Sequence, residues 1–208
     1  MLSVAYGSRS TTSTGWWPPG PLSSADVHPT YVALLRGINV GGKNRILMAD
    51  LTTCFESAGY ERVRTFIQSG NVVFRARRGG RAGLTHAIEQ MLAEAFGYKA
   101  TIALRDQDEM RAVVDAAPPG FGEQPDRYRY DVLFLMPTLT SAEVLSALMM
   151  TDGVDAAWAG PGVVYHSRLT ARASQSRMSR LVSHPVYRYL TIRNWNTTTR
   201  LLSMMSEG

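Results

Sequence analysis

The sequence predicts an α+β protein made of two ferredoxin-like β-α-β-β-α-β units in tandem, with mainly antiparallel sheets. Three observations support this prediction. Short apolar runs of strand length alternate with apolar stripes of helical spacing, a tight turn joins two strands in each half, and the same order of elements occurs twice. Because no residue-level repeat is visible, the prediction of two units depends on element order alone.

The composition is that of an ordinary globular protein of 208 residues, of which 45% are hydrophobic and 19% charged. No apolar run approaches the ~20 residues of a membrane span, so we expect no membrane partner. The single cysteine, Cys54, excludes an intrachain disulfide and a zinc cluster and is typical of a reducing cytoplasm. The four histidines lack metal-ligand spacing, and we expect neither a metal nor another cofactor.

Residues 1–29 are rich in Ser, Thr, Gly and Pro and are predicted to be a disordered extension. A first unit with a trailing helix is expected over residues 30–118. Its elements are expected at Tyr31–Leu35 (strand), Met48–Ala58 (helix), Val63–Gln68 and Asn71–Ala76 (hairpin), Leu84–Phe96 (helix) and Ala100–Arg105 (strand). Gly59 and Gly97 are expected to end the two helices. The trailing helix begins at Asp106, where Glu109 completes a capping box.

A second unit with a C-terminal helix is expected over residues 128–206, after a polar linker. Thr140 and Glu143 form a second capping box, and Gly160-Pro161-Gly162 forms the second tight turn. The expected elements are Tyr128–Met136 (strand), a helix from Thr140, Val154–Trp158 and Val163–Ser167 (strands), a short helix near Gln175–Val182, Tyr187–Ile192 (strand) and Thr197–Met205 (helix).

A candidate anion-binding edge follows from strand direction. In this element order the loop after the first strand and the hairpin turn emerge at the same edge of the sheet. Glycine-exposed backbone N–H groups beside fixed cations are what an oxyanion requires. The loop is not a Walker A motif, because Lys43 is followed by Asn44 rather than Ser or Thr. The alternative is that the glycines only form turns and that Asn44 caps the following helix.

A second polar segment, Arg193–Asn196, lies where the last strand meets the last helix, and we expect it to join the same site. It has more polar residues than a helix cap needs, and Trp195 either stacks on a ligand ring or closes a core. The predicted ligand-binding residues are Arg36, Asn39, Lys43, Asn44, Arg45, Ser69, Asn71, Arg193, Asn194 and Asn196.

The charge is unevenly distributed. Residues 31–155 contain 14 Lys and Arg against 15 Asp and Glu, whereas residues 156–208 contain 7 Arg and one acid, Glu207. The stretch Ser167–Arg180 alone carries four arginines and no acid. This asymmetry is what a phosphate-bearing small molecule or RNA as partner would require, and the more common explanation is a basic solvated surface.

Three strings, ALLRGINVGGKN, TFIQSGNVVF and TIRNWNTTTRLL, resemble the DUF1697 family of bacterial proteins of unknown function. The resemblance runs from about Tyr31 to Met205. It implies a pair of ferredoxin-like α+β units and supplies no catalytic residues. In that family the first strand begins near the start of the chain, which supports the expectation that residues 1–29 are dispensable.

Three functions remain open from the sequence. The first is a module that binds a nucleotide or RNA at the glycine-rich basic edge. The second is an enzyme with a small anionic substrate, although no carboxylate pair or nucleophile–base grouping falls in these loops. The third is a scaffold whose polar loops only tie the two units together. The sequence predicts no catalytic residue and no oligomeric state.

Overall fold

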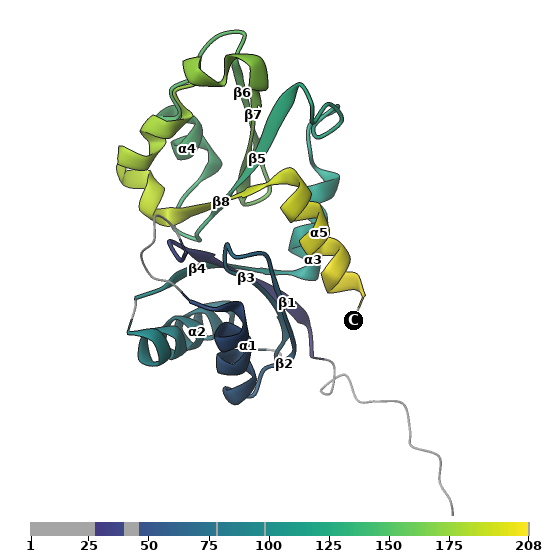
Figure 1. Cartoon of the computed structure of the whole chain (residues 1–208), viewed down its shortest axis with the longest axis vertical. Coiled ribbons are helices and arrows are strands. Elements are labelled where there is room, and N and C mark those ends of the chain that lie inside the picture. The colour runs from purple at the N-terminus through teal and green to yellow at the C-terminus, as the bar shows by residue number, and fades with distance from the viewer. Residues whose placement is uncertain (1–27, 40–45, 78, 98, 208) are drawn as a thin grey trace, which may run out of the picture.

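The computed structural model describes residues 28–39, 46–77, 79–97 and 99–207 (Figure 1). The strands are β1 (Thr30–Arg36), β2 (Glu61–Phe66), β3 (Asn71–Arg75), β4 (Thr101–Asp106), β5 (Tyr128–Leu135), β6 (Asp155–Gly160), β7 (Val163–Leu169) and β8 (Leu190–Asn194). The α-helices are α1 (Met48–Ser57), α2 (Arg81–Phe96), α3 (Gln107–Asp115), α4 (Ser141–Ala147) and α5 (Trp195–Ser206). Three 3-10 stretches precede β8: η2 (Thr170–Gln175), η3 (Met178–Ser183) and η4 (Pro185–Tyr189).

The strands form two four-stranded antiparallel sheets, which confirms the predicted fold class. Their strand orders are β2-β3-β1-β4 and β6-β7-β5-β8, so the arrangement of the first sheet recurs in the second. In the first sheet Leu34 lies opposite Asn71, and Arg36 lies opposite Thr101. The end of β1 and the beginnings of β3 and β4 therefore lie at one edge, as strand direction predicts.

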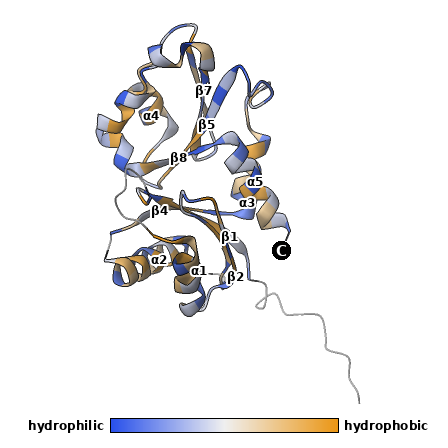
Figure 2. Cartoon of the chain, in the orientation of Figure 1, coloured by the Kyte–Doolittle hydropathy of each residue, from blue (hydrophilic) through white to orange (hydrophobic). Residues whose placement is uncertain are grey.

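The two sheets share a hydrophobic core. Helices α1 and α2 cover one face of the first sheet, and α4 with the 3-10 stretches covers one face of the second (Figures 1 and 2). The remaining faces pack together with α3 and α5 around fully buried side chains that include Val32, Phe134 and Tyr165. The division into units 30–118 and 128–206 stays a prediction. The shared core couples the stability of one sheet to that of the other, since each buries a face against its partner.

Helix ends follow the local capping signals. Asp106 with Glu109 and Thr140 with Glu143 form the two predicted capping boxes. The N-cap of α5 is Asn194, whose side chain accepts a hydrogen bond from the Thr197 backbone N–H at 2.7 Å. Helix α5 therefore begins at Trp195, two residues before the predicted start.

Helix α1 begins at Met48 with Leu47 at its N-cap, and Asn44, the alternative cap, lies outside the described residues. One predicted helix is wrong in detail. The helix expected near Gln175–Val182 is replaced by η2 and η3. A serine-rich stretch gains little α-helical stability, and Pro185 beyond it cannot continue a helix. The last strand correspondingly begins at Leu190 rather than Tyr187.

Candidate functional site

The predicted edge of the first sheet is held together by its own side chains. Arg36 Nε donates to the Tyr187 carbonyl at 3.2 Å, and its guanidinium lies 4.8 Å from the centre of the Tyr187 ring. The Asn39 side chain bonds the backbone of Ile46 at 2.8 and 3.0 Å and the Gln68 carbonyl at 2.9 Å. These contacts hold Asn39 and Ile46 together beside the β2–β3 turn. Three predicted site residues, Lys43, Asn44 and Arg45, lie outside the described residues.

Asn71 is fully buried at the start of β3. Its amide nitrogen donates to the Phe66 carbonyl at 2.9 Å and to Ser69 Oγ at 3.0 Å, which closes the β2–β3 turn. Its amide oxygen accepts a hydrogen bond from Arg193 Nε. Ser69, Asn71 and Arg193 therefore meet, although they are distant in sequence.

The Arg193 guanidinium is saturated by protein acceptors. Only 7% of the residue is exposed, and burial lowers the pKa of its guanidinium to about 10. It donates to the Leu35 carbonyl at 2.8 Å, to the Ser69 and Gly70 carbonyls at 3.0 and 3.3 Å, and to Thr191 Oγ1 at 2.9 Å. Those donors are engaged in joining β8 to the first sheet, which is a structural role.

Arg105 makes the reciprocal connection from the first sheet to the second. It donates to the Leu135 carbonyl at 2.6 Å and to the Gly162 carbonyl at 2.9 Å. Each arginine thus leaves the last strand of its own sheet and binds the end of the first strand and the hairpin turn of the other. Each also donates to the carbonyl of the preceding residue, at 2.8 Å in both cases. Arg105 and Arg193 therefore occupy equivalent positions in the two units, an equivalence that the sequence alone did not reveal.

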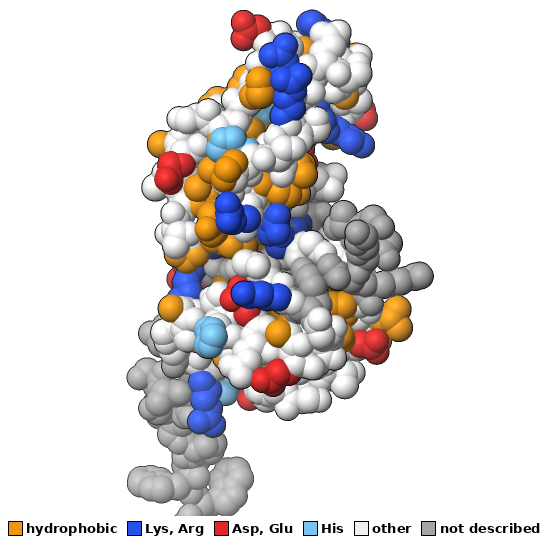
Figure 3. Space-filling model, turned by 90° about the vertical axis from the view of Figure 1, so that its left-hand side faces the viewer, with side chains coloured by type: hydrophobic (Ala, Val, Ile, Leu, Met, Phe, Trp, Pro, Cys, Tyr) orange, Lys and Arg blue, Asp and Glu red, His pale blue; other side chains and the backbone are white. Residues whose placement is uncertain are grey.

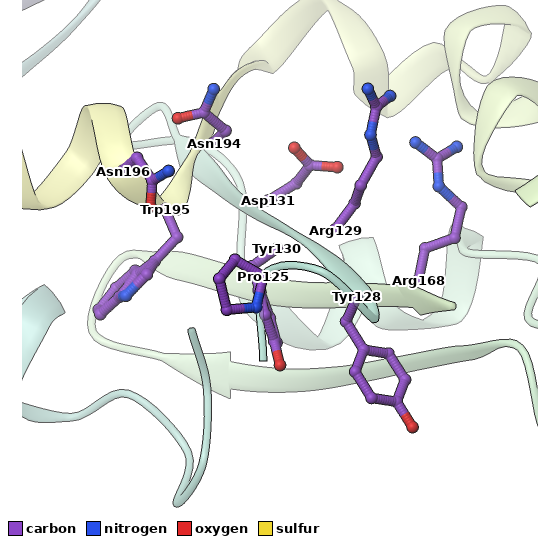
Figure 4. Close-up of a pocket in the computed structure, with 9 residues that line it drawn as sticks. All are labelled: Pro125, Tyr128, Arg129, Tyr130, Asp131, Arg168, Asn194, Trp195 and Asn196. Atoms are coloured by element: carbon purple, nitrogen blue, oxygen red, sulfur yellow. The ribbon is translucent and has the colours of Figure 1, made fainter. Parts of the chain in front are cut away.

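A separate pocket lies where β8 passes into α5 (Figure 4). We call it the β8–α5 pocket, and its volume is about 310 Å³. It is lined by Pro125, Tyr128, Arg129, Tyr130, Asp131, Arg168, Asn194, Trp195 and Asn196. Asn194 and Asn196, two of the predicted site residues, are exposed here. They belong to this pocket, whereas Arg193 faces the first sheet.

The pocket combines two cations with the N-terminus of a helix. Arg129 on β5 and Arg168 on β7 lie directly opposite each other in the register, and Figure 4 shows their side chains running alongside each other. Arg168 Nε is buried and has no hydrogen-bond partner among the described residues. The Thr197 N–H of α5 is capped by Asn194 Oδ1, whereas the N–H groups of Trp195 and Asn196 have no intrahelical acceptor, and the positive end of the helix dipole faces this region.

One carboxylate, Asp131, also lines the pocket. It lies opposite His166 on β7 and opposite Asn194 on β8. Burial raises the pKa of Asp131, and the charges of His166, Arg168 and Arg129 partly counteract that rise. A carboxyl group with this environment can accept a hydrogen bond when ionised and donate one when protonated.

Trp195 closes the neighbouring core as well as bordering the pocket. Its ring meets the Phe121 ring edge-on at 5.2 Å, and the Phe121 ring is 4.8 Å from that of Tyr130. A Cβ atom on Gly122 would lie 2.2 Å from Trp195 Nε1, so a glycine is required there. The aromatic wall of the pocket is thus fixed by packing, and the alternatives of ring stacking and core closure do not exclude each other.

The basic stretch at Ser167–Arg180 is divided by the structure. Arg168 belongs to the pocket, whereas Arg172, Arg177 and Arg180 are exposed on or beside the 3-10 stretches. Figure 3 shows several arginine side chains on this face of the second sheet's half, with hydrophobic side chains between them. Arg180 approaches the Met149 sulfur at 3.9 Å, so cations and apolar side chains are in contact there.

Sequence reasoning missed Arg129, Asp131 and the two tyrosines of the pocket. Asp131 and His166 each interrupt an apolar strand, and a titratable residue in such a run was the available signal. Only the strand register shows that they are neighbours. Among the described residues, no three His, Cys, Asp or Glu side chains gather so that they could hold a metal. No described helix has the length and hydrophobicity needed to cross a membrane.

The fold and the pocket define an α+β protein with two antiparallel sheets and a basic pocket beside the second. The chain belongs to the family described as protein of unknown function (DUF1697), whose model matches residues 29–165. It is also similar to the structure of the conserved bacterial protein SP0830 from Streptococcus pneumoniae. The identity is 27% and the TM-score 0.75, over 86% of this chain and 99% of that one. No curated protein matches the sequence.

Proposed function

We propose that this protein binds a small phosphate-bearing ligand in the β8–α5 pocket. The observation that carries the proposal is the pairing of Arg129 with Arg168 beside the N-terminus of α5. Guanidinium groups and helix N-termini both bind phosphate oxygens well. A volume of about 310 Å³ is at the small end of the range for ligand pockets, which favours a ligand no larger than a mononucleotide.

The other groups of the pocket suit a ligand with a polar ring or sugar. The rings of Tyr128, Tyr130 and Trp195 border the pocket on the side away from Arg129 and Arg168, and Asp131 and Asn196 offer acceptors for hydroxyl or amino groups. This combination supports a nucleotide over inorganic phosphate alone. The single cysteine is in keeping with the cytoplasmic location that we also propose.

The glycine-rich edge after β1 supports the binding proposal less well. Arg193 is saturated, and Arg36 and Asn39 hold neighbouring segments together. The contribution of Lys43, Asn44 and Arg45 stays a prediction. Arg36→Ala therefore tests the edge separately from the pocket.

The test is isothermal titration of the full chain with inorganic phosphate and with adenosine monophosphate. Each charge-assisted hydrogen bond contributes about 1.5–3 kcal/mol, so Arg129→Ala or Arg168→Ala should weaken binding at least tenfold. Arg177→Ala removes the same charge from an exposed position outside the pocket and should leave these affinities unchanged. Equal losses in all three variants, or loss only in Arg36→Ala, would contradict the pocket as the binding site.

RNA is the second candidate ligand, favoured by the exposed Arg172, Arg177 and Arg180 of the basic stretch. A strand that leaves the pocket could contact these arginines through its phosphates. In that case a short RNA should bind more tightly than the mononucleotide, and Arg177→Ala should remove the difference. Equal affinity for the two ligands would favour the mononucleotide.

A further inference from the structure

The buried side-chain nitrogen and oxygen atoms without a hydrogen-bond partner in the described residues all belong to one group beside the pocket. They are Asp155 Oδ1, both ring nitrogens of His166, and Arg168 Nε. His166 Nε2 and Asp155 Oδ1 are 3.3 Å apart, within ion-pair distance but outside good hydrogen-bond geometry. Since most buried polar atoms in native proteins are paired, such a concentration calls for a functional explanation.

The strand register places His166 between two carboxylates. Asp131 on β5 lies directly opposite His166, and on the other side β6 places Ala157 opposite it. Asp155 is two residues before Ala157 and shares its face of the sheet. The side chains of His166 and Asp155 are 1% and 0% exposed, whereas Asp131 lines the pocket. We call these three residues the Asp131–His166–Asp155 row.

The charged groups that face the row come from several elements. Arg129 on β5 and Arg168 on β7 are its cations, and β8 contributes the neutral Asn194. From η2, an Arg172 nitrogen lies 3.7 Å from the Cβ position of Gly153, in the turn before β6. Helix α4 and the 3-10 stretch η3 supply apolar side chains to the core on this face. With His166 neutral, the two cations on β5 and β7 balance the two carboxylates of the row.

Burial favours the neutral form of both His166 and Asp131. It lowers the pKa of His166 and raises the pKa of Asp131, so both groups are driven toward their neutral forms. A dianion in the pocket would add negative charge beside Asp131. Negative charge nearby favours the protonated form of both groups.

We propose that the Asp131–His166–Asp155 row takes up one proton when a dianion binds in the β8–α5 pocket. The proton leaves a solvent hydronium ion and forms one O–H or N–H bond in the row, no other covalent bond changes, and the gained proton belongs to the row as a coupled unit. The pocket then recognises a dianionic oxyanion, such as a phosphate monoester, together with a proton. This inference depends on the proposed function of the pocket.

Sulfate is the probe, because it stays a dianion throughout the neutral and mildly acidic range. Its affinity for the full chain is measured by isothermal titration from about pH 8 to 5.5, which spans the ordinary histidine pKa. Uptake of one proton predicts an affinity that rises up to about tenfold for each unit of falling pH. Asp131→Asn combined with His166→Gln should abolish this slope. The control His86→Gln, at an exposed histidine on α2, should keep it.

Imidazole NMR of the unaltered chain provides a second measurement that does not depend on a variant folding. Saturation with sulfate should move the titration of the buried His166 to higher pH. If protonation falls on Asp131 instead, the carboxyl carbon resonance of Asp131 should move in the same direction.

The outcomes separate the two proposals. Failure of sulfate to bind at any pH would overturn the proton-uptake inference, whereas the proposed function falls only if inorganic phosphate and adenosine monophosphate both fail to bind. Binding with no pH dependence would overturn proton uptake alone and leave the pocket as a binding site. A slope that persists in the double variant would place the proton elsewhere and also overturn the inference.

Discussion

Replacement of Arg193 by Met should destabilise the protein strongly, although no proposed ligand contacts this residue. Methionine retains much of the apolar length of the side chain and removes all of its donors. The lost hydrogen bonds include those to the Leu35, Ser69 and Gly70 carbonyls of the first sheet and to the Asn71 side chain. Four of the buried acceptors therefore lose a charged donor together.

The expected loss is smaller than a sum over these bonds. The Gly70 carbonyl keeps its bond from the Leu35 backbone N–H at 2.8 Å. Removing a charged residue also removes the cost of burying it. A buried acceptor left unpaired costs about 1–3 kcal/mol. If two acceptors stay unpaired, we expect the free energy of unfolding to fall by about 2–6 kcal/mol.

The assay is urea unfolding at neutral pH, followed by tryptophan fluorescence and by far-UV circular dichroism. Arg105→Met should behave similarly, because Arg105 makes the reciprocal bonds to Leu135 and Gly162. Arg177→Met, at an exposed position, should change the unfolding free energy by less than about 0.5 kcal/mol. A loss under 1 kcal/mol for Arg193→Met would refute the view that this arginine joins the two sheets.

Three further changes follow from the same structure. Gly70→Ala should cost more stability in a urea titration than Gly59→Ala. Both glycines have a positive φ, but a Cβ atom on Gly70 would meet neighbouring atoms at 2.5–2.9 Å, whereas on Gly59 it would meet nothing within 4 Å; equal costs would contradict this. Asp131→Asn should raise the melting temperature at neutral pH. Because the folded pKa of Asp131 is raised, its ionisation destabilises the fold as pH rises through that pKa, so the gain should vanish below the unfolded value near 3.8; a gain that persists in acid would exclude this cause. Tyr165→Phe should cost about 1 kcal/mol or more in thermal unfolding, because the buried hydroxyl donates to the Val113 carbonyl at 2.6 Å, and an unchanged midpoint would show that this bond is dispensable.

The sequence by itself determined the elements whose causes are local. Capping boxes at Asp106 and Thr140 fixed where α3 and α4 begin, because an N-cap side chain and the N3 residue are three positions apart. The Ser69-Gly70 turn and the alternation of apolar runs identified the β2–β3 hairpin in the same way. The order of these elements was enough to predict two antiparallel sheets.

Tertiary structure alone decided which distant side chains meet. His166 and Asp131 are neighbours through the register of β5 and β7, and a shift of one residue would place them on opposite faces. The predicted edge depended on the assumption that polar residues near a glycine-rich loop face a ligand. Burial of Arg193 between the sheets directs its donors to backbone carbonyls instead, because buried acceptors must be paired. That requirement depends on how the two sheets pack, which no local pattern in the sequence specifies.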